Sequence, residues 1–336
     1  MWDVRGNARA FDMTFAFDPS RRLAAIVIGR AGMDLYPIPD GAKTESATNF
    51  AAEIGGSAGN IAVALARQGF SAALLGPLSD DPVGRFVRSN LKRYAVDTSR
   101  CRAVAGEFRT SLALAETRFE NCEIVLYRHG AADLQLRTDD FDSAFIGSAS
   151  VLIVTGTALA AEPSRGSAME ALAWARATQT FSILDVDYRP YSWRSRDEAM
   201  RIFVDAGNRC DAVVGNDEEF AVIAGDQGNA LTTASEFVKK GCRFAIFKKG
   251  KAGSITITAE TAFETGTFAV DTKKPFGSGD AFLGNLVAAL LRGLSLEPAV
   301  QRAAAAAAYV VSRRGCAFAM PTAAELESFL LSHQIT

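Results

Sequence analysis

Short apolar runs alternate with amphipathic stretches along most of the chain. The runs lie at 24–29, 72–76, 151–156, 182–187, 212–216 and 244–250. Runs this short and apolar predict buried strands, whereas the stretch 82–96 has the spacing of an amphipathic helix. Strands that alternate with helices predict an α/β fold with a mostly parallel sheet covered on both faces.

Polar residues follow several of the predicted strands. They are Asp34, Asp185, Asp187, Arg189, Asn216 and Glu219. Ligands of open parallel sheets bind at the carboxyl ends of the strands. We therefore expect a binding site along this edge of the sheet.

Two segments interrupt the alternation of strands and helices. Residues 36–53 are polar and loop-like, and residues 107–128 alternate apolar with polar side chains as a β-hairpin does. Together they predict a small antiparallel β lid over the strand ends. The remaining segments, which form the α/β core, are 23–35, 54–106 and 129–333.

The composition excludes several classes of protein. The 336 residues carry a formal net charge of −2, which offers no basic surface for nucleic acid, and no apolar run is long enough to span a membrane.

Residues 1–22 lack the apolar segment of a signal peptide, and we expect an N-terminal extension whose Phe11, Phe15 and Phe17 pack on the core. Five scattered cysteines without a C-x-x-C pair favour reduced thiols in the cytoplasm over disulfides or zinc. Because there are only two histidines, acid–base chemistry must fall mainly to carboxylates.

The segment KKPFGSGDAFLGNLVAALLRG, residues 273–293, places glycines and an aspartate directly before a long apolar run. The run predicts a buried helix, and the amides of Gly277, Ser278 and Gly279 at its N-terminus would form an anion site. Asp280 then stands where an anion should bind, which an anion-binding loop alone does not need. The alternative is that Asp280 caps the helix.

A second glycine-rich turn, IGGSAGNIAVALARQG at 54–69, also runs into a helix. It is not a P-loop, because an Asn-Ile pair stands where Lys and Ser or Thr are required, and its spacing does not fit a dinucleotide fingerprint. Gly55, Gly56 and Asn60 suit the recognition of hydroxyl groups, or else close packing of helix and strand. Asp34, just after the first strand, either accepts hydrogen bonds from a polyol or caps a turn.

Two further motifs each have a binding and a structural interpretation. Asn216 and Glu219, at a strand-to-helix junction, could hold magnesium-bound water and phosphate or simply begin a helix. The turn at 248–253 suits nucleotide phosphates or an ordinary hairpin. Its residues of interest are Lys249, Gly250 and Gly253.

Two of these motifs, GGSAGN at 55–60 and GSGDAFLGN at 277–285, resemble in their order and spacing the ribokinase-like (PfkB) family of sugar kinases. The resemblance runs from residue 24 to about residue 331 and implies a three-layer α/β/α fold with a small antiparallel β lid. It implies that Asp280 is the catalytic base and that Gly277-Ser278-Gly279 is the anion hole, with Ser in place of the usual Ala. The preceding VDTKKPF departs from the commoner V-D-T-T, which bears on any potassium site near Asp271.

The resemblance also implies the reaction and its participants. ATP would donate its γ-phosphoryl group to a primary hydroxyl of a small sugar, and magnesium would be organised indirectly through Asn216 and Glu219. The residues that would hold the sugar hydroxyls are Asp34, Gly55, Gly56 and Asn60. In relatives the lid pairs with a second subunit, which implies a homodimer through the lid.

Within the family, four segments resemble kinases that act on sugar acids: GRAGMDLYP, LYRHGAAD, LDVDYRPYSW and VVSRRGCAFAMPT. Such kinases set arginines against the substrate carboxylate, and Arg128 and Arg189 occupy the matching positions. A bidentate contact between guanidinium and carboxylate is the physical reason for arginine there. The alternative for Arg189 is an ion pair with Asp185 or Asp187.

Other functions stay open at this point. A 2-keto-3-deoxygluconate kinase and a fructokinase are alternatives within the kinases. A nicotinamide-dependent oxidoreductase shares the α/β layout but requires a dinucleotide fingerprint, and the chain has none. A sugar-sensing protein without catalysis would lack the base, whereas Asp280 is present.

Overall fold

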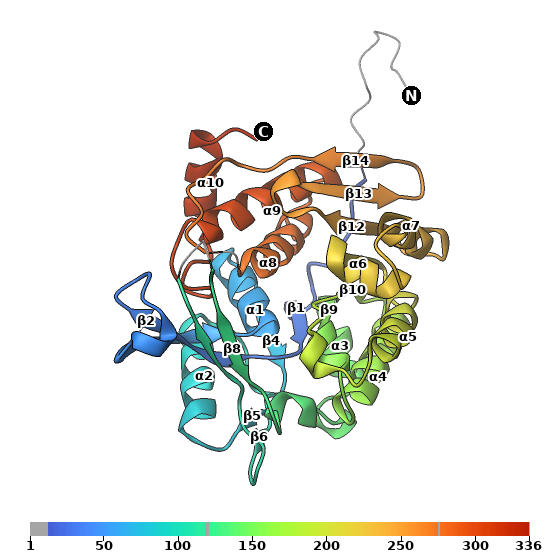
Figure 1. The fold of residues 1–336 in the computed structure, drawn as a ribbon. Coiled ribbons are helices and arrows are strands. Elements are labelled where there is room, and N and C mark those ends of the chain that lie inside the picture. The colour runs from blue at the N-terminus through green and yellow to red at the C-terminus, as the bar shows by residue number, and fades with distance from the viewer. Residues whose placement is uncertain (1–12, 118–120, 275, 336) are drawn as a thin grey trace.

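A computed structural model describes residues 13–117, 121–274 and 276–335. Within these residues an eight-stranded sheet forms the centre of the molecule (Figure 1). Its strands, in spatial order, are β14 (Ala262–Thr265), β13 (Ser254–Thr258), β12 (Phe244–Lys248), β11 (Ala212–Asn216), β10 (Phe181–Asp185), β9 (Ala149–Thr155), β1 (Leu23–Ile28) and β4 (Ala72–Leu75). The strands from β12 to β4 are parallel, and β13 and β14 add an antiparallel edge.

Helices cover both faces of this sheet. One face carries α1 (Ser57–Arg67), α8 (Ser278–Leu291), α9 (Leu296–Val311) and α10 (Ala323–Ser332), with α2 (Pro82–Arg93) beside them. The other face carries α3 (Ser143–Gly147), α4 (Ser164–Ala177), α5 (Arg196–Gly207), α6 (Asp217–Ala224) and α7 (Ala230–Lys239).

Two hydrophobic cores separate the three layers. Along β1, Ala25 and Val27 belong to one core, and Ile26 and Ile28 belong to the other. This alternation follows from the two-residue period of a strand, and it explains why strands buried on both faces are apolar throughout. The predicted three-layer fold is confirmed. The runs predicted as strands did not include β13, β14 or the short pair β5 (Leu78–Ser79) and β6 (Ala103–Val104).

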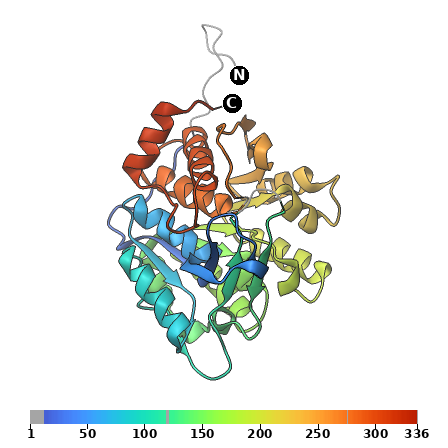
Figure 2. The same cartoon turned by 60° about the vertical axis from the view of Figure 1, so that its left-hand side comes forward.

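A second sheet of four strands lies beside the carboxyl ends of the large sheet, and Figure 2 turns this side of the molecule forward. Its order is β3 (Asn49–Gly55), β2 (Gly32–Ile38), β7 (Leu112–Ala115) and β8 (Ile124–Tyr127). Two antiparallel hairpins, β2–β3 and β7–β8, are joined by a parallel pairing of β2 with β7. The first hairpin extends beyond the 36–53 segment at both ends. Asp34 therefore lies inside a strand and does not cap a turn.

The described part of the N-terminal extension packs on the core. Phe15 is buried, and its ring lies edge-on against Phe181 and Phe244. Phe17 contacts Phe181 in the same way. Phe11 lies outside the described residues. No helix in the described ranges is long and apolar enough to cross a membrane.

Candidate active site

The candidate site lies where the chain reverses its direction of growth across the large sheet. From β1 the chain first adds β4 on one side and later adds β9 on the other. Such a switch point leaves a crevice at the carboxyl ends of the strands. The N-terminal ends of α1 and α8 converge there because the two helices pack unusually closely. A Cβ on Gly284 of α8 would lie 2.5 Å from the Cβ of Ala64 on α1.

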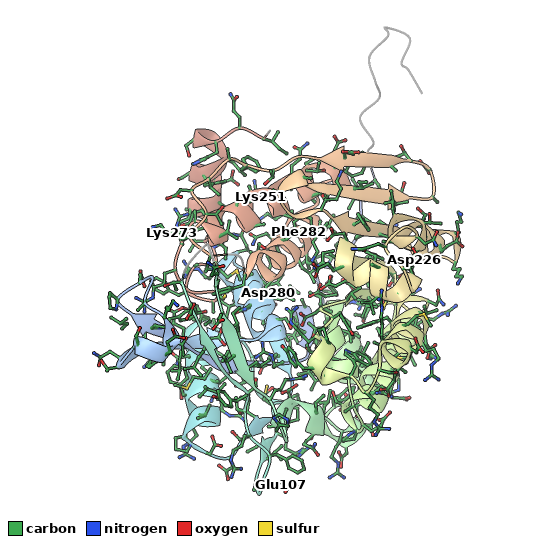
Figure 3. The ribbon with its side chains drawn as sticks, viewed as in Figure 1. Glu107, Asp226, Lys251, Lys273, Asp280 and Phe282 are labelled. Carbon is green, nitrogen blue, oxygen red and sulfur yellow. The ribbon has the colours of Figure 1, made fainter. Side chains whose placement is uncertain are left out.

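Asp280 stands at the N-terminal end of α8, where Figure 3 labels it. The helix begins at Ser278, and its N-cap is Gly277, whose φ of 85° is in the left-handed region that favours glycine. Asp280 is in the first turn and does not occupy the N-cap position, so the capping alternative does not describe it. Its Oδ2 instead accepts a hydrogen bond of 2.7 Å from Nδ2 of Asn60 on α1. The two glycine-rich motifs of the sequence therefore meet at this carboxylate.

The surroundings of Asp280 raise the pKa of its carboxyl group. Burial, reinforced by repulsion from Asp187, raises the pKa of Asp280 to about 6. The hydrogen bond from Asn60 and the positive charges of Arg189 and Lys248 act in the opposite direction. A carboxylate with a pKa near 6 is ionised at neutral pH and takes up a proton more readily than an ordinary aspartate.

We expect an acidic limb in the pH dependence of kcat/KM from this pKa. With Asp280 as the base that the family resemblance implies, activity should be full well above pH 6 and should decline as the pH falls through about 6. Asn60→Ala removes a bond that stabilises the carboxylate and should move the limb to higher pH. Asp187→Asn removes a repelling charge and should move it to lower pH. The ionisation of the substrates is common to all three proteins, so shifts in the same direction for both variants would contradict the assignment.

Asp187 joins three parts of the site. It has a positive φ of 34°, its Oδ2 accepts a 2.6 Å hydrogen bond from the Ser57 hydroxyl, and its Oδ1 lies 2.7 Å from Nη2 of Arg189. A non-glycine residue with positive φ is uncommon and is often found at functional sites. Arg189 therefore has the ion-pair partner that was the alternative to substrate binding. This pair raises the pKa of the Arg189 guanidinium.

A lysine that sequence analysis did not single out completes the charge pattern. Nζ of Lys248, at the end of β12, lies 4.0 Å from Oδ1 of Asp185 and 3.4 Å from the position of a Cβ on Gly279. Burial raises the pKa of Asp185 well above its usual value, and Lys248 opposes that shift. The rule that placed polar ligands after strands would have found Lys248, since it directly follows the apolar residues 244–247. It adds a positive charge beside the anion loop.

The Asn216–Glu219 pair forms a capping box at the start of α6. Oδ1 of Asn216 accepts a 2.8 Å bond from the Glu219 amide, and Oε2 of Glu219 accepts a 2.7 Å bond from the Asn216 amide. Burial raises the pKa of Glu219. Asn216 and Glu219 also line a cavity of about 720 Å³ that reaches Arg189. The two residues therefore begin a helix, as one interpretation of the motif predicted, and Glu219 also lies on the wall of an open cavity.

The turn with Lys249, Gly250 and Gly253 connects β12 to β13 at the antiparallel edge. The Lys249 amide donates to the Gly253 carbonyl at 2.7 Å, and its Nζ lies 3.1 Å from Oε2 of Glu264. Gly250 and Gly253 both have positive φ, 57° and 79°. These features are those of a tight hairpin turn. Its backbone stands at the same edge of the sheet as Lys248.

The residues predicted to hold sugar hydroxyls come together at the junction of lid and core. A Cβ on Gly55 would overlap the carboxylate of Asp34, so the glycine makes room for that side chain. A Cβ on Gly56, whose φ is 90°, would lie 2.5 Å from the carbonyl oxygen of Arg30. Asp34 is 7% exposed, and its buried Oδ1 has no hydrogen-bond partner among the described residues. Burial raises the pKa of Asp34, and the charge of Arg30 is the largest effect opposing it.

Arg128, predicted to bind a substrate carboxylate, has several partners within the protein. Its Nη2 lies 2.5 Å from Oδ2 of Asp133 and 3.1 Å from the Thr157 carbonyl oxygen, and its Nη1 donates to Ser192 at 2.9 Å. The side chains of Arg128 and Asp133 are 5% and 2% exposed. This arginine therefore fastens the end of β8 to the core through Nη1 and Nη2, whereas its buried Nε has no hydrogen-bond partner among the described residues. That it binds a substrate carboxylate stays a prediction, and the structure adds a structural role beside it.

Arg128→Met should lower the free energy of unfolding by about 3–5 kcal/mol, because it leaves the Asp133 carboxylate buried without its partner. Urea denaturation measures this. Arg137→Met is the matched control: Arg137 is 59% exposed and pairs with Asp139 on the surface, so its loss should change stability by less than about 0.5 kcal/mol. Unchanged stability of Arg128→Met together with a raised KM for the sugar would return Arg128 to a substrate role.

A lysine beneath the anion loop was also missed from sequence. Lys274 is fully buried, and its Nζ donates a 2.6 Å hydrogen bond to the Phe276 carbonyl oxygen. Nζ lies 4.9 Å from the centre of the Phe276 ring, which stacks on Tyr36 of the lid, and 3.9 Å from Sγ of Cys316. A Cβ on Gly277 would lie 2.9 Å from the same Sγ. A buried ammonium therefore fixes the backbone from which the loop 277–279 begins.

Comparison with known proteins gives the family. The family model for the pfkB family carbohydrate kinases matches residues 23–323. The chain belongs to the pfkB family of carbohydrate kinases. It is therefore an ATP-dependent sugar kinase, and the oxidoreductase and sugar-sensing alternatives are not favoured.

Named relatives align with the kinase over nearly its whole length. A 5-dehydro-2-deoxygluconokinase of Photobacterium profundum is 38% identical over 320 residues, which cover 94% of this chain and 97% of the relative. A 5-dehydro-2-deoxygluconokinase of Geobacillus kaustophilus is 34% identical, with 95% and 96% covered.

Solved structures agree with the fold of the kinase. A putative ribokinase II of E. coli, in complex with ATP and Mg²⁺, superposes with a TM-score of 0.82 at 19% identity and covers 93% of this chain and 100% of that one. An aminoimidazole riboside kinase of Salmonella enterica has a TM-score of 0.78 at 25% identity, with 92% and 99% covered.

Proposed function

We propose that the kinase transfers the γ-phosphoryl group of ATP to the primary hydroxyl of 5-dehydro-2-deoxygluconate and forms its 6-phosphate, a step of myo-inositol catabolism. The observation that carries the proposed chemistry is Asp280, a carboxylate with a pKa of about 6 at the N-terminus of α8 beside a glycine loop. The proposed substrate is supported by relatives of that name at 34% and 38% identity over nearly full length.

Asp280 supplies the base in this proposal. As the primary hydroxyl attacks the γ-phosphorus, its proton passes to the Asp280 carboxylate, the new P–O bond forms, and the bond to the β-phosphate oxygen breaks to release ADP. The amides of the 277–280 turn and the ammonium of Lys248 face the region where negative charge spreads over the transferred group. Arg189, which forms an ion pair with Asp187, lowers the pKa of Asp280 and so favours its ionised form.

Magnesium accompanies ATP in this proposal and neutralises charge on its phosphates. The donors at the cavity wall fit a hard cation held through water, because Glu219 is a carboxylate and Asn216 an amide beside it. No group of three or more His, Cys, Asp or Glu side chains in the described ranges is arranged to hold a metal directly. Lys249, Gly250 and Gly253 are the proposed contacts of the nucleotide. Potassium activation is not part of the proposal, because Lys274 already places a positive charge under the loop.

The lid residues hold and cover the sugar in this proposal. Asp34, Gly55, Gly56 and Asn60 bind its hydroxyl groups, and the lid excludes water, which would otherwise compete as phosphoryl acceptor. We propose a homodimer through the lid as well. Val125 and Tyr127 of its edge strand β8 are 45% and 61% exposed, and an exposed apolar edge strand favours pairing with another chain. Cys101, Cys210, Cys242 and Cys316 are buried free thiols, which suits the cytoplasm.

A panel of acceptors tests the substrate. ADP release would be measured with 5-dehydro-2-deoxygluconate, 2-keto-3-deoxygluconate, fructose and ribose, and NMR would locate the phosphate on the product. We expect kcat/KM for 5-dehydro-2-deoxygluconate to exceed the others by about 100-fold or more, because a site built for its polar groups leaves them unpaired with an analogue. A higher value for 2-keto-3-deoxygluconate or for a neutral sugar would overturn this substrate.

A further inference from the structure

Arg30 stands at the centre of the sugar side of the site. It lies two residues after the end of β1, at the switch point of the large sheet. Its carbonyl oxygen accepts a 3.2 Å hydrogen bond from the amide of Gly59 in the first turn of α1, one residue before Asn60, which binds Asp280. Its backbone is therefore held rigidly against the helix that positions the base.

The side chain of Arg30 reaches from the core to the lid. Its Nη1 donates a 3.1 Å hydrogen bond to Oγ of Ser111, a buried residue that precedes β7. The same Nη1 lies 3.1 Å from the position of a Cβ on Gly32, so glycine at the start of β2 leaves room for the guanidinium. The guanidinium is partly buried beside the strand that carries Asp34.

The guanidinium of Arg30 differs from those of the two arginines predicted to bind a carboxylate. Arg128 is committed to Asp133, and Arg189 is committed to Asp187. No carboxylate of the described residues lies within 4.0 Å of the Arg30 guanidinium. A partly buried guanidinium with one hydroxyl partner retains donors for a bidentate contact with a carboxylate.

The neighbour of Arg30 is an unsatisfied acceptor. The side chain of Asp34 is more than nine-tenths buried, and its Oδ1 has no hydrogen-bond partner among the described residues. Arg30 is the cation that most favours the ionised form of Asp34. The site therefore presents an acceptor for hydroxyl groups and a cation side by side. An acidic substrate placed here without the cation would meet a second negative charge.

We propose that Arg30 binds the carboxylate of the sugar acid, with Asp34 accepting hydrogen bonds from its hydroxyl groups. This rests on the proposed function, since it concerns how the same site selects an acid. The substrate carries its carboxylate at the opposite end of the carbon chain from the hydroxyl that is phosphorylated. The backbone of Arg30 contacts the first turn of α1 while its side chain extends toward the lid, and Asp280 contacts α1 from α8.

Arg30→Met tests the proposal when two acceptors are compared. One is 5-dehydro-2-deoxygluconate, and the other is its neutral analogue with a hydroxymethyl group in place of the carboxylate. We expect kcat/KM for the acid to fall by about 10- to 100-fold, the usual scale of a lost charge-assisted contact. The value for the neutral analogue should stay the same or rise, and KM for ATP should not change. Arg30→Lys should recover part of the loss, because an ammonium lacks the planar fork.

Two other arginines provide comparisons. Arg22 precedes β1 at its other end and is 59% exposed, so Arg22→Met loses the same charge far from the site and should not change either kcat/KM. Arg189→Met removes a charge that acts on Asp280 and should lower both values alike. An equal loss for acid and neutral acceptors in Arg30→Met, with a lower melting temperature, would overturn the role of Arg30 and show it to be a structural partner of Ser111.

The wild-type protein separates the two hypotheses. If it prefers another sugar acid and Arg30→Met loses that acid selectively, the proposed substrate fails and the role of Arg30 stands. If it prefers neutral sugars, both fail. If it prefers 5-dehydro-2-deoxygluconate and Arg189→Met alone loses the acid selectively, only the role of Arg30 fails.

Discussion

Asp280→Asn should lower kcat by about 100-fold or more while the protein stays folded. The amide has nearly the shape of the carboxylate but cannot take the proton of the attacking hydroxyl. Because it also removes a buried negative charge that Asp187 repels, the melting temperature should stay the same or rise. KM for ATP should change little. Steady-state kinetics and thermal unfolding of the same preparation measure both effects.

The matched control is Asp205→Asn, the same chemical change on the exposed surface of α5. It should leave kcat within experimental error of the wild type. If Asp280→Asn retained activity within a few-fold of the wild type, the acceptance of the hydroxyl proton would have to be assigned to another group. Retained activity with a lower melting temperature would instead make Asp280 a stabilising element of the α8 terminus.

Lys274→Met should lower kcat by about 10-fold or more without lowering stability. An ammonium that is fully buried carries a desolvation penalty, and methionine fills a similar volume without one. What is lost is the 2.6 Å bond to the Phe276 carbonyl oxygen, which sets the start of the loop 277–279. A loop misplaced by about 1 Å can reduce catalysis by roughly 100-fold. KM for the sugar should change much less than kcat.

Its neighbour provides the control, since Lys273 is exposed and Lys273→Met removes the same charge one residue earlier. This variant should behave as the wild type. Ammonium or potassium ions should restore part of the activity of Lys274→Ala, in which the space of the side chain is vacant, and choline should not. A lower melting temperature with normal kcat per folded molecule would mean that Lys274 only supports the fold.

The sequence indicated much of the fold because buried strands and helices have distinct periods. The strand ends at Asp185 and Asn216 lie along one edge of the sheet, as predicted. The motifs around Asn60 and Asp280 were 220 residues apart in the chain, and the family resemblance was needed to expect them together. Their hydrogen bond in the structure gives that expectation a physical basis.

The roles of individual charged residues could not be predicted as well. Arg128 and Arg189 match the positions of ligand-binding arginines, but pattern alone does not reveal that Asp133 and Asp187 engage them. The sequence analysis assigned no role to Lys274, which is fully buried in the structure. Such outcomes depend on tertiary contacts, because the burial of a long side chain is set by residues far away in sequence.

The close packing of α1 against α8 has a consequence for how the enzyme can diversify. A Cβ on Gly284 would lie only 2.5 Å from the Cβ of Ala64. Even the methyl group of an alanine at position 284 would therefore push the two helices apart and separate Asn60 from Asp280. Substitutions in this contact between α1 and α8 would therefore be selected against, because they would lower catalytic turnover. The strands of the lid lie outside the contact between α1 and α8, so residues on them can be substituted without moving Asp280. A preference for a different sugar acceptor should therefore arise by substitution in the lid, while the arrangement of Asn60 and Asp280 stays unchanged.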